Sequence, residues 1–369
     1  MPPDATTQQR PSAALGLITI LMTLAGWSSV PLFIKHFSAA IDPWTSNGWR
    51  YGFSALLWMP VLIVGALGIG GRSLPRGLWR AALLPAVFNA IGQAAFTWAF
   101  YKLDPATVTF GLRMQIVFVA TGAYLLFPSE RAALRKPAAW GGIVLVLVGI
   151  GGTVLMSAPS GAAAHSGEAH LLGIVLAIGS GIFFAAYALA VRWFMHGYHP
   201  VTAFAAISQY TALVTVALML AAGDRHGLTA LDTTVLSRGQ FGLLLVSAII
   251  GIALGHVFYY ISIARLGVAV SSGVIQLQPF CVAIAQAALG WQSINRGQIA
   301  FGTGAVCGSM LLLWVQWRTS REAGRIAAAP SHLPIDPAKL PEVVPGPEAV
   351  GIEAAEMDVV PVRTESRSQ

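Results

Sequence analysis

The residues best suited to chemistry in this sequence are charged and polar side chains inside long apolar stretches. Arg50 lies seven residues after Pro43, and Arg113 lies eight residues after Pro105. Each would therefore sit on the order of 11 Å along a helix from its start. Charges at such depth in an apolar medium are costly and usually line a cavity or find a partner. Since no Asp or Glu lies in the interior of these stretches, we expect both guanidinium groups to bind the carboxylate or phosphate of a ligand.

The two arginines also allow a purely structural interpretation. A long side chain can extend toward the end of its helix and bond carbonyl groups there. Arg50 and Arg113 could in the same way pair with Asp42 or Asp104, which lie at predicted helix ends.

Four glutamines also fall near the middle of apolar stretches: Gln115, Gln209, Gln276 and Gln278. Their amides could hydrogen-bond the polar remainder of a ligand that the arginines hold. Gln276 and Gln278 are two residues apart, which places them roughly 200° apart around a regular helix. On that basis, both cannot face one cavity squarely.

Transport coupled to protons requires a group that titrates within the apolar region. His256 is the single histidine inside such a stretch, and histidine can change charge near neutral pH. A hydrogen-bonded core histidine opposite Gln93 is the alternative. Asp104 is a second candidate proton carrier, although it could equally be a helix-end charge. Cys281 and Cys307 are isolated in apolar stretches, so neither a metal site nor another cofactor is expected.

The composition defines the medium that surrounds these groups. Of 369 residues, 56% are hydrophobic and only 10% are charged, whereas soluble domains carry about a quarter charged residues. So little charge cannot cover a soluble surface of this size. The composition excludes an ordinary soluble enzyme, a disordered protein and a nucleic-acid-binding domain, and it predicts an outer surface in contact with lipid.

Ten apolar stretches are long enough to cross a bilayer, and we expect an all-α membrane protein. They span approximately residues 13–34, 43–65, 78–101, 105–127, 138–158, 171–194, 201–222, 240–263, 267–290 and 297–317. A short segment, 1–12, precedes them, and a polar, proline-rich segment, 318–369, follows them. The first is expected to be cytoplasmic, and the second to be a disordered cytoplasmic tail.

The distribution of lysine and arginine predicts the orientation of the chain. With the N-terminus inside, 12 basic residues lie on the inner side and five on the outer side. Positive residues favour the cytoplasmic side. We therefore expect a multi-pass protein of the cytoplasmic (inner) membrane with both termini in the cytoplasm.

The sequence matches itself in two blocks, 13–158 and 171–317. An offset of 157 superimposes Lys35 on Arg192 and Phe37 on Phe194, and an offset of 163 superimposes Lys102 on Arg265, Leu103 on Leu266 and Gln115 on Gln278. Five spans is an odd number, so the second repeat inserts with the opposite orientation. Inverted repeats can exchange conformations around a central site, which favours a transporter that works by alternating access.

Several short segments carry a family resemblance. They are Tyr101-Lys102-Leu103, Trp140-Gly141-Gly142, Ala264-Arg265-Leu266-Gly267 and Gln278-Pro279-Phe280. With the ten-span layout, they resemble the drug/metabolite transporter superfamily, EamA type. The resemblance implies two inverted five-helix repeats and a secondary transporter that often exports amino acids or related metabolites. The sequence departs from the family pattern at Ile116, where a proline is usual, and after Gly290, where an acid is usual.

These observations together predict a secondary transporter, not an enzyme, that exports small carboxylate-bearing metabolites such as amino acids. Its partners would be the substrate, a coupling proton and lipid, with no nucleic acid, and it would act as a monomer or homodimer. A substrate exchanger or facilitator is the first alternative, because the spans lack buried carboxylates. A membrane-embedded transferase is the second, although the sequence shows no nucleophile–base pair for it.

Overall fold

A computed structural model describes residues 13–69, 73–128, 131–156, 167–266, 268–291 and 295–327. Within these ranges every regular element is helical. Ten helices there are long and apolar enough to cross a membrane. The predicted all-α membrane fold is therefore confirmed. Residues 1–12 and most of the expected tail, 328–369, lie outside the described part of the chain.

The first repeat consists of five spans, of which the fourth is broken. Its helices are α1 (Ala13–Phe37), α2 (Pro43–Ala66), α3 (Leu78–Phe100), α4 (Pro105–Leu112), α5 (Met114–Leu126), the short α6 (Arg131–Leu134) and α7 (Pro137–Met156). Asp42 and Asp104 explain where α2 and α4 begin, because each carboxylate accepts backbone N–H bonds from the first turn. Each is followed by a proline, which has no N–H to satisfy.

The second repeat has the same plan with two interruptions. Its elements are α8 (Gly167–Phe194), α9 (Pro200–Ala222), the 3₁₀ segment η4 (Asp224–Leu231), α10 (Arg238–Ala248), the π-helical segment η5 (Ile249–Leu254), α11 (Gly255–Leu266), α12 (Val268–Ile275), α13 (Gln278–Ala288) and α14 (Arg296–Ala327). α10, η5 and α11 form one span, and α12 and α13 form the next.

Hydrogen bonds between distant loops define the two ends of the bundle. At the end where α1 finishes, here called the distal end, Asp42 accepts a bond from the backbone of Asp224, and Asn295 bonds the carbonyl of Met156. At the opposite, proximal end, Lys136 near the start of α7 pairs with Glu322 near the end of α14. Successive spans therefore run in alternating directions.

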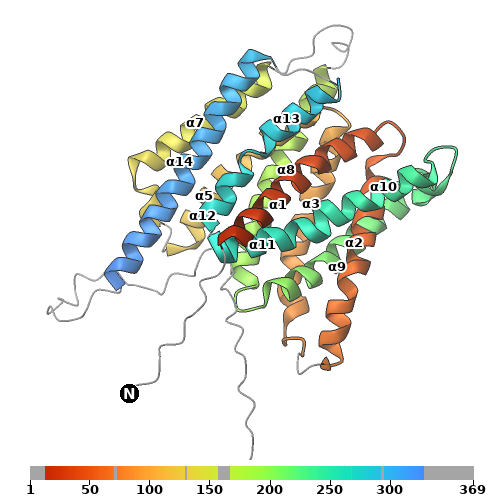
Figure 1. Ribbon diagram of the computed structural model, residues 1–369, viewed down its shortest axis with the longest axis horizontal. Helices are drawn as coiled ribbons and strands as arrows, with labels where there is room; N and C mark the ends of the chain where they lie inside the picture. The colour runs from red at the N-terminus through yellow and green to blue at the C-terminus, as the bar shows by residue number, and fades with distance from the viewer. Residues whose placement is uncertain are drawn as a thin grey trace, which may run out of the picture.

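The packing of the helices follows the repeat. α2 packs on α9 and α7 on α14, and in each of these pairs the two helices are repeat equivalents, while α4 packs on α13, which belongs to the repeat-equivalent span. α1 packs on α11 in the way that α8 packs on α3. In Figure 1, α7 and α14 lie side by side on one flank of the bundle, with α2, α9 and α10 on the other.

Close contacts at glycines show the same symmetry in more detail. Gly16 faces Leu266 across the α1–α11 contact, and its equivalent Gly173 faces Leu103 across the α8–α3 contact. A Cβ added at either glycine would lie under 3 Å from the opposing leucine. These contacts reproduce the offsets of 157 and 163 in space, so the predicted two-repeat architecture is confirmed.

The structure corrects three spans that the sequence predicted as continuous helices. The fourth span breaks at Arg113, between α4 and α5, and the eighth contains the π-helical segment η5. The ninth breaks between α12 and α13, where Pro279 has no N–H to donate to Ile275. α4 and α12 are each eight residues long and lie 163 residues apart, so the two breaks are repeat equivalents.

The end of the last span also differs from the prediction. α14 continues to Ala327, so residues 318–327, expected in the disordered tail, are helical. The pairing of Lys136 with Glu322 lies within this extension.

Candidate functional site

A cavity of about 410 Å³ lies between the two repeats, at the level of both helix breaks. Five of the six predicted ligand-binding residues line it: Arg50, Arg113, Gln115, Gln276 and Gln278. Aromatic side chains from both repeats complete its walls, among them Trp27, Phe96, Phe184, Phe204 and Tyr259. No Asp or Glu occurs among the described residues that line it.

Arg113 occupies the first helix break and reaches across to the second. Its Nη2 donates to Oε1 of Gln278 at 2.5 Å, and its Nη1 lies 3.4 Å from Oε1 of Gln276. Nη1 also lies 3.5 Å from the carbonyl oxygen of Ile275, the group that Pro279 leaves without its helical donor. Arg113 thus joins the two repeats at the centre of the cavity.

The two glutamines of the second break both face Arg113, which corrects the prediction that they point in different directions. That prediction assumed a regular helix, whereas residues 276 and 277 form a turn between α12 and α13. Gln278 uses both ends of its amide, because its Nε2 also donates to the carbonyl of Trp27 at 2.7 Å.

Arg50 enters the cavity from α2 and is only 3% exposed. Its Nε donates to Oγ of Ser247 on α10 at 3.1 Å. Among the described residues, no carboxylate hydrogen-bonds to Arg50 or to Arg113. Asp42 and Asp104 accept bonds from helix starts instead. The structural alternative therefore applies only to Arg113, which bonds the carbonyls of Thr109 and Ile275.

His256 forms part of the cavity wall on α11. Its Nδ1 lies 2.9 Å from the carbonyl oxygen of Ile252. Because a carbonyl can only accept, Nδ1 carries the proton and Nε2 is the acceptor in the neutral ring. The ring stacks on Phe204 with centroids 4.5 Å apart and contacts the edge of Trp27.

Two predicted residues lie away from the cavity. Gln209 on α9 donates from Nε2 to the carbonyl of Ala55 on α2 at 2.9 Å. Asp104 accepts from the backbone of Thr107 at 3.0 Å and so fixes the start of α4. Neither residue lines the cavity in this conformation.

The structure also places polar groups in the cavity that the sequence analysis did not assign. Asn89 on α3 donates to Oγ1 of Thr211, and Tyr259 exchanges a hydrogen bond with Ser272 at 2.8 Å. Asn89 lies eleven residues after Leu78, near the middle of its span. The sequence could have indicated this residue, because an amide near the middle of an apolar span is the same signal that identified the four glutamines.

The cavity extends toward one end of the bundle only. Its lining reaches Met195 and Tyr198 after the end of α8 and Gln316 in the second half of α14, all on the proximal side. On the distal side the lining includes Val30 and Phe96 but not the residues that end α1 and α3. The described structure is thus hollow toward the proximal end.

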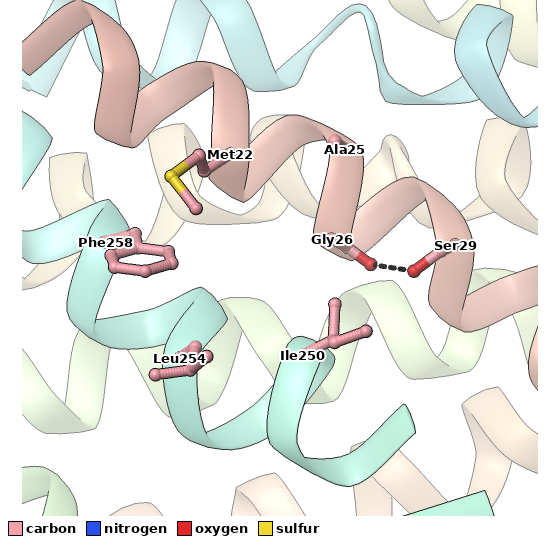
Figure 2. A pocket seen from close by; sticks show the side chains of 7 residues that line it. All are labelled: Met22, Ala25, Gly26, Ser29, Ile250, Leu254 and Phe258. Atoms are coloured by element: carbon pink, nitrogen blue, oxygen red, sulfur yellow. Dashed lines mark hydrogen bonds between the residues drawn. The ribbon is translucent and has the colours of Figure 1, made fainter. Parts of the chain in front are cut away.

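A second hollow, of about 340 Å³, lies on another face of α1 (Figure 2). Met22, Ala25, Gly26 and Ser29 of α1 line it opposite Ile250, Leu254 and Phe258. Met22 and Leu254 are 50% and 42% exposed, so this hollow opens to the outside of the bundle. Its lining offers apolar contact and no charged group.

Comparisons with known proteins extend these observations. The sequence matches the EamA-like transporter family twice, over residues 14–155 and 171–314. A solved structure described only as "Crystal structure of protein" shares 17% identity with a TM-score of 0.52. The match covers 82% of this chain and 97% of that one, and at this identity it shows a similar fold alone. The comparison with curated proteins found no match.

Proposed function

The chain belongs to the EamA-like transporter family, and from that premise we propose that it exports small carboxylate-bearing metabolites, such as amino acids, by alternating access. The observation that carries the proposal is the pair of buried guanidinium groups, Arg50 and Arg113, in a cavity whose described lining contains no carboxylate. A buried cation without an acidic partner is stabilised by an anionic ligand, and a planar guanidinium binds a carboxylate through two parallel bonds.

The remaining walls fit the rest of such a substrate. Gln115 adds an amide to those of Gln276 and Gln278, so polar substituents of the substrate find both donors and acceptors. Trp27, Phe184 and Phe204 offer flat apolar surfaces for a hydrocarbon or aromatic side chain. Binding of a carboxylate would draw Arg113 away from Gln278, which couples substrate occupancy to the contact between the two breaks.

The orientation proposed from the positive residues places the proximal end in the cytoplasm of a cell with an inner membrane. The cavity would then be open to the cytoplasm, the side from which an exporter takes its substrate. Both termini would be cytoplasmic, and the protein would act as a monomer or homodimer.

For proton coupling we propose His256 rather than Asp104 as the titrating group. His256 lies in the cavity wall with Nε2 as an acceptor, whereas Asp104 holds the start of a helix. The absence of a carboxylate among the described lining residues favours substrate exchange as the second candidate mode, because exchange requires no titrating group. Export with a pH gradient but no counter-substrate would support coupling, and strict dependence on counter-substrate would support exchange.

The decisive experiment is flux in proteoliposomes with a panel of amino acids, organic acids and amines. We expect carboxylates to be transported, Arg113→Ala to abolish their flux and Arg113→Lys to retain part of it. Lys102→Ala is the matched control, since it removes an exposed positive charge far from the cavity. Full activity of Arg113→Ala, or transport of amines alone, would contradict the proposal.

A further inference from the structure

A lysine in the last turn of α1 links α1 to the end of α3 at the distal end of the bundle. Lys35 Nζ donates to the carbonyl oxygen of Phe100 at 2.9 Å and to that of Leu103 at 3.1 Å. Phe100 is the last residue of α3, and Leu103 lies three residues beyond it. No further helical turn follows there to supply N–H donors to these two carbonyls. One charged side chain therefore satisfies two orphan acceptors and ties the ends of α1 and α3 together.

This link joins two helices whose main packing partners differ. α1 packs mainly on α11, and α3 packs mainly on α8. Direct contact between α1 and α3 is slight. The bonds of Lys35 thus add a polar link to the apolar cluster that Ile34 and Phe100 share, at the end to which the cavity does not extend.

The repeat supplies an equivalent residue at the other end. With the offset of 157, Lys35 corresponds to Arg192 and Phe37 to Phe194, so both basic residues lie two positions before the last residue of their helix. With the offset of 163, the carbonyls of Phe100 and Leu103 correspond to those of Ile263 and Leu266 on α11. The paired contacts Gly16–Leu266 and Gly173–Leu103 show that these offsets hold in space at both helix contacts.

Arg192 has a different position in this structure. Its guanidinium lies over the ring of Phe127, 4.0 Å from the centroid, at the proximal end where the cavity extends. Phe127 follows the last residue of α5, so this contact is made to the first repeat. The side chain is buried, with the residue 8% exposed.

We propose that Lys35 and Arg192 are alternating latches of the transport cycle. In the described conformation Lys35 holds the distal end closed. In the opposite conformation Lys35 releases α3, and Arg192 leaves Phe127 to donate to the carbonyls of Ile263 and Leu266, which closes the proximal end. The proposal rests on the alternating access proposed above. Since the two states exchange equivalent bonds, neither is strongly favoured, as a reversible cycle requires.

The test measures which end is open, by cysteine labelling of the full chain in a Cys281→Ala, Cys307→Ala background. The reporters are Gln316→Cys, at the proximal end of the cavity, and its repeat equivalent Thr153→Cys, which replaces a residue that is 0% exposed. Each is labelled with a small water-soluble maleimide, and the ratio of the two rates reports the equilibrium between the conformations.

We expect Lys35→Ala, which removes both charged hydrogen bonds, to raise the labelling rate at Thr153→Cys by at least on the order of tenfold and to lower it at Gln316→Cys. Arg192→Ala should leave Thr153→Cys protected. Combining Lys35→Ala with Arg192→Ala should return the ratio toward the wild-type value, because both states then lack their latch. Lys35→Arg should keep the wild-type ratio and so shows that the site tolerates substitution.

The matched controls are Lys102→Ala and Arg265→Ala. They remove exposed charges from the same two ends, and these residues are themselves repeat equivalents. An unchanged ratio in Lys35→Ala, or a double variant as shifted as Lys35→Ala alone, would overturn the proposal. Labelling requires no substrate, so a failure of the latches is distinguishable from a failure of the proposed export, which the flux assay measures.

Discussion

The two helix breaks share one geometry and differ in chemistry. α4 ends before Arg113, and α12, of the same length, ends before Gln276 at the equivalent position. The first break presents a guanidinium and the second an amide, and the two bond each other across the cavity. An inverted repeat thus supplies a matched pair of backbone sites, and the difference between Arg113 and Gln276 puts a positive charge at one of the two.

The two breaks also differ in what prevents a continuous α-helix from forming there. At the second, Pro279 removes the N–H that would bond Ile275. At the first, the equivalent residue is Ile116, whose N–H bonds the carbonyl of Arg113 at 3.1 Å. Gly181 of α8 packs there, and a Cβ on it would lie 3.0 Å from the carbonyl oxygen of Leu112. One break is therefore encoded locally and the other by tertiary packing.

The largest expected effect comes from exchanging the chemistry of the two breaks. Arg113→Gln should lower carboxylate flux about 100-fold, the effect of losing a charged, bidentate partner. Adding Gln276→Arg to that variant should restore part of the flux, because the guanidinium then returns from the equivalent position. Proteoliposome flux at equal protein content measures both variants, and Gln276→Ala alone should have a milder effect. No recovery in the double variant would show that the two breaks are not interchangeable.

A smaller effect should follow from replacing the proline of the second break by its repeat equivalent. Pro279→Ile supplies an N–H that can bond Ile275, in competition with Arg113. We expect a ~3- to 10-fold loss of flux, because the turn at Gln276 would tend to become helical and direct one glutamine away from the cavity. Pro43→Ile serves as the control, because it replaces a proline in the first turn of α2, where an added N–H has no helical acceptor. Unchanged flux in Pro279→Ile would mean that Arg113, not Pro279, maintains the break.

These differences also show what the sequence could and could not reveal. Spans, repeats and the matched depth of Arg50 and Arg113 follow from apolar run lengths, which the bilayer thickness fixes. Pro279 gave a local signal for the second break, although the prediction treated the span as a regular helix. The first break depends on Gly181 of a distant helix, and the direction of Gln209 depends on a carbonyl of α2. Contacts of that kind require the tertiary arrangement.

A further difference between the repeats lies in the aromatic walls beside the breaks. Trp27 and Phe184 are repeat equivalents that both line the cavity, and each faces a glycine, Gly255 and Gly92 respectively. The Trp27 indole donates to the carbonyl of Gly251 at 3.0 Å, inside the π-helical segment η5. A phenyl ring has no such donor, and α3 is a continuous α-helix at the equivalent position.

Trp27→Phe would remove the indole N–H that distinguishes Trp27 from Phe184. It should lower the free energy of unfolding by about 1 kcal/mol, the usual contribution of one buried hydrogen bond. Thermal unfolding in detergent measures the loss, and Trp49→Phe is the matched control. Trp49 makes an indole bond of 2.9 Å to the carbonyl of Gly227, away from the cavity. We expect similar stability losses in both variants and altered flux only in Trp27→Phe. Equal flux in the Trp27→Phe and Trp49→Phe variants would show that transport does not depend on the indole bond to the π-helical segment.

The smallest effect is expected where charges pair at the proximal surface rather than at the breaks. The hydrogen bond from Lys136 lowers the pKa of the Glu322 carboxyl below its ordinary value. A lowered folded-state pKa contributes stability above the ordinary glutamate range, and that contribution is lost as the pH falls through the folded pKa. Because both side chains are exposed and solvent screens them, Glu322→Gln should leave Tm unchanged at neutral pH and at acidic pH. A clear Tm decrease at neutral pH that disappears in acid would show that this exposed pair holds α14 to α7.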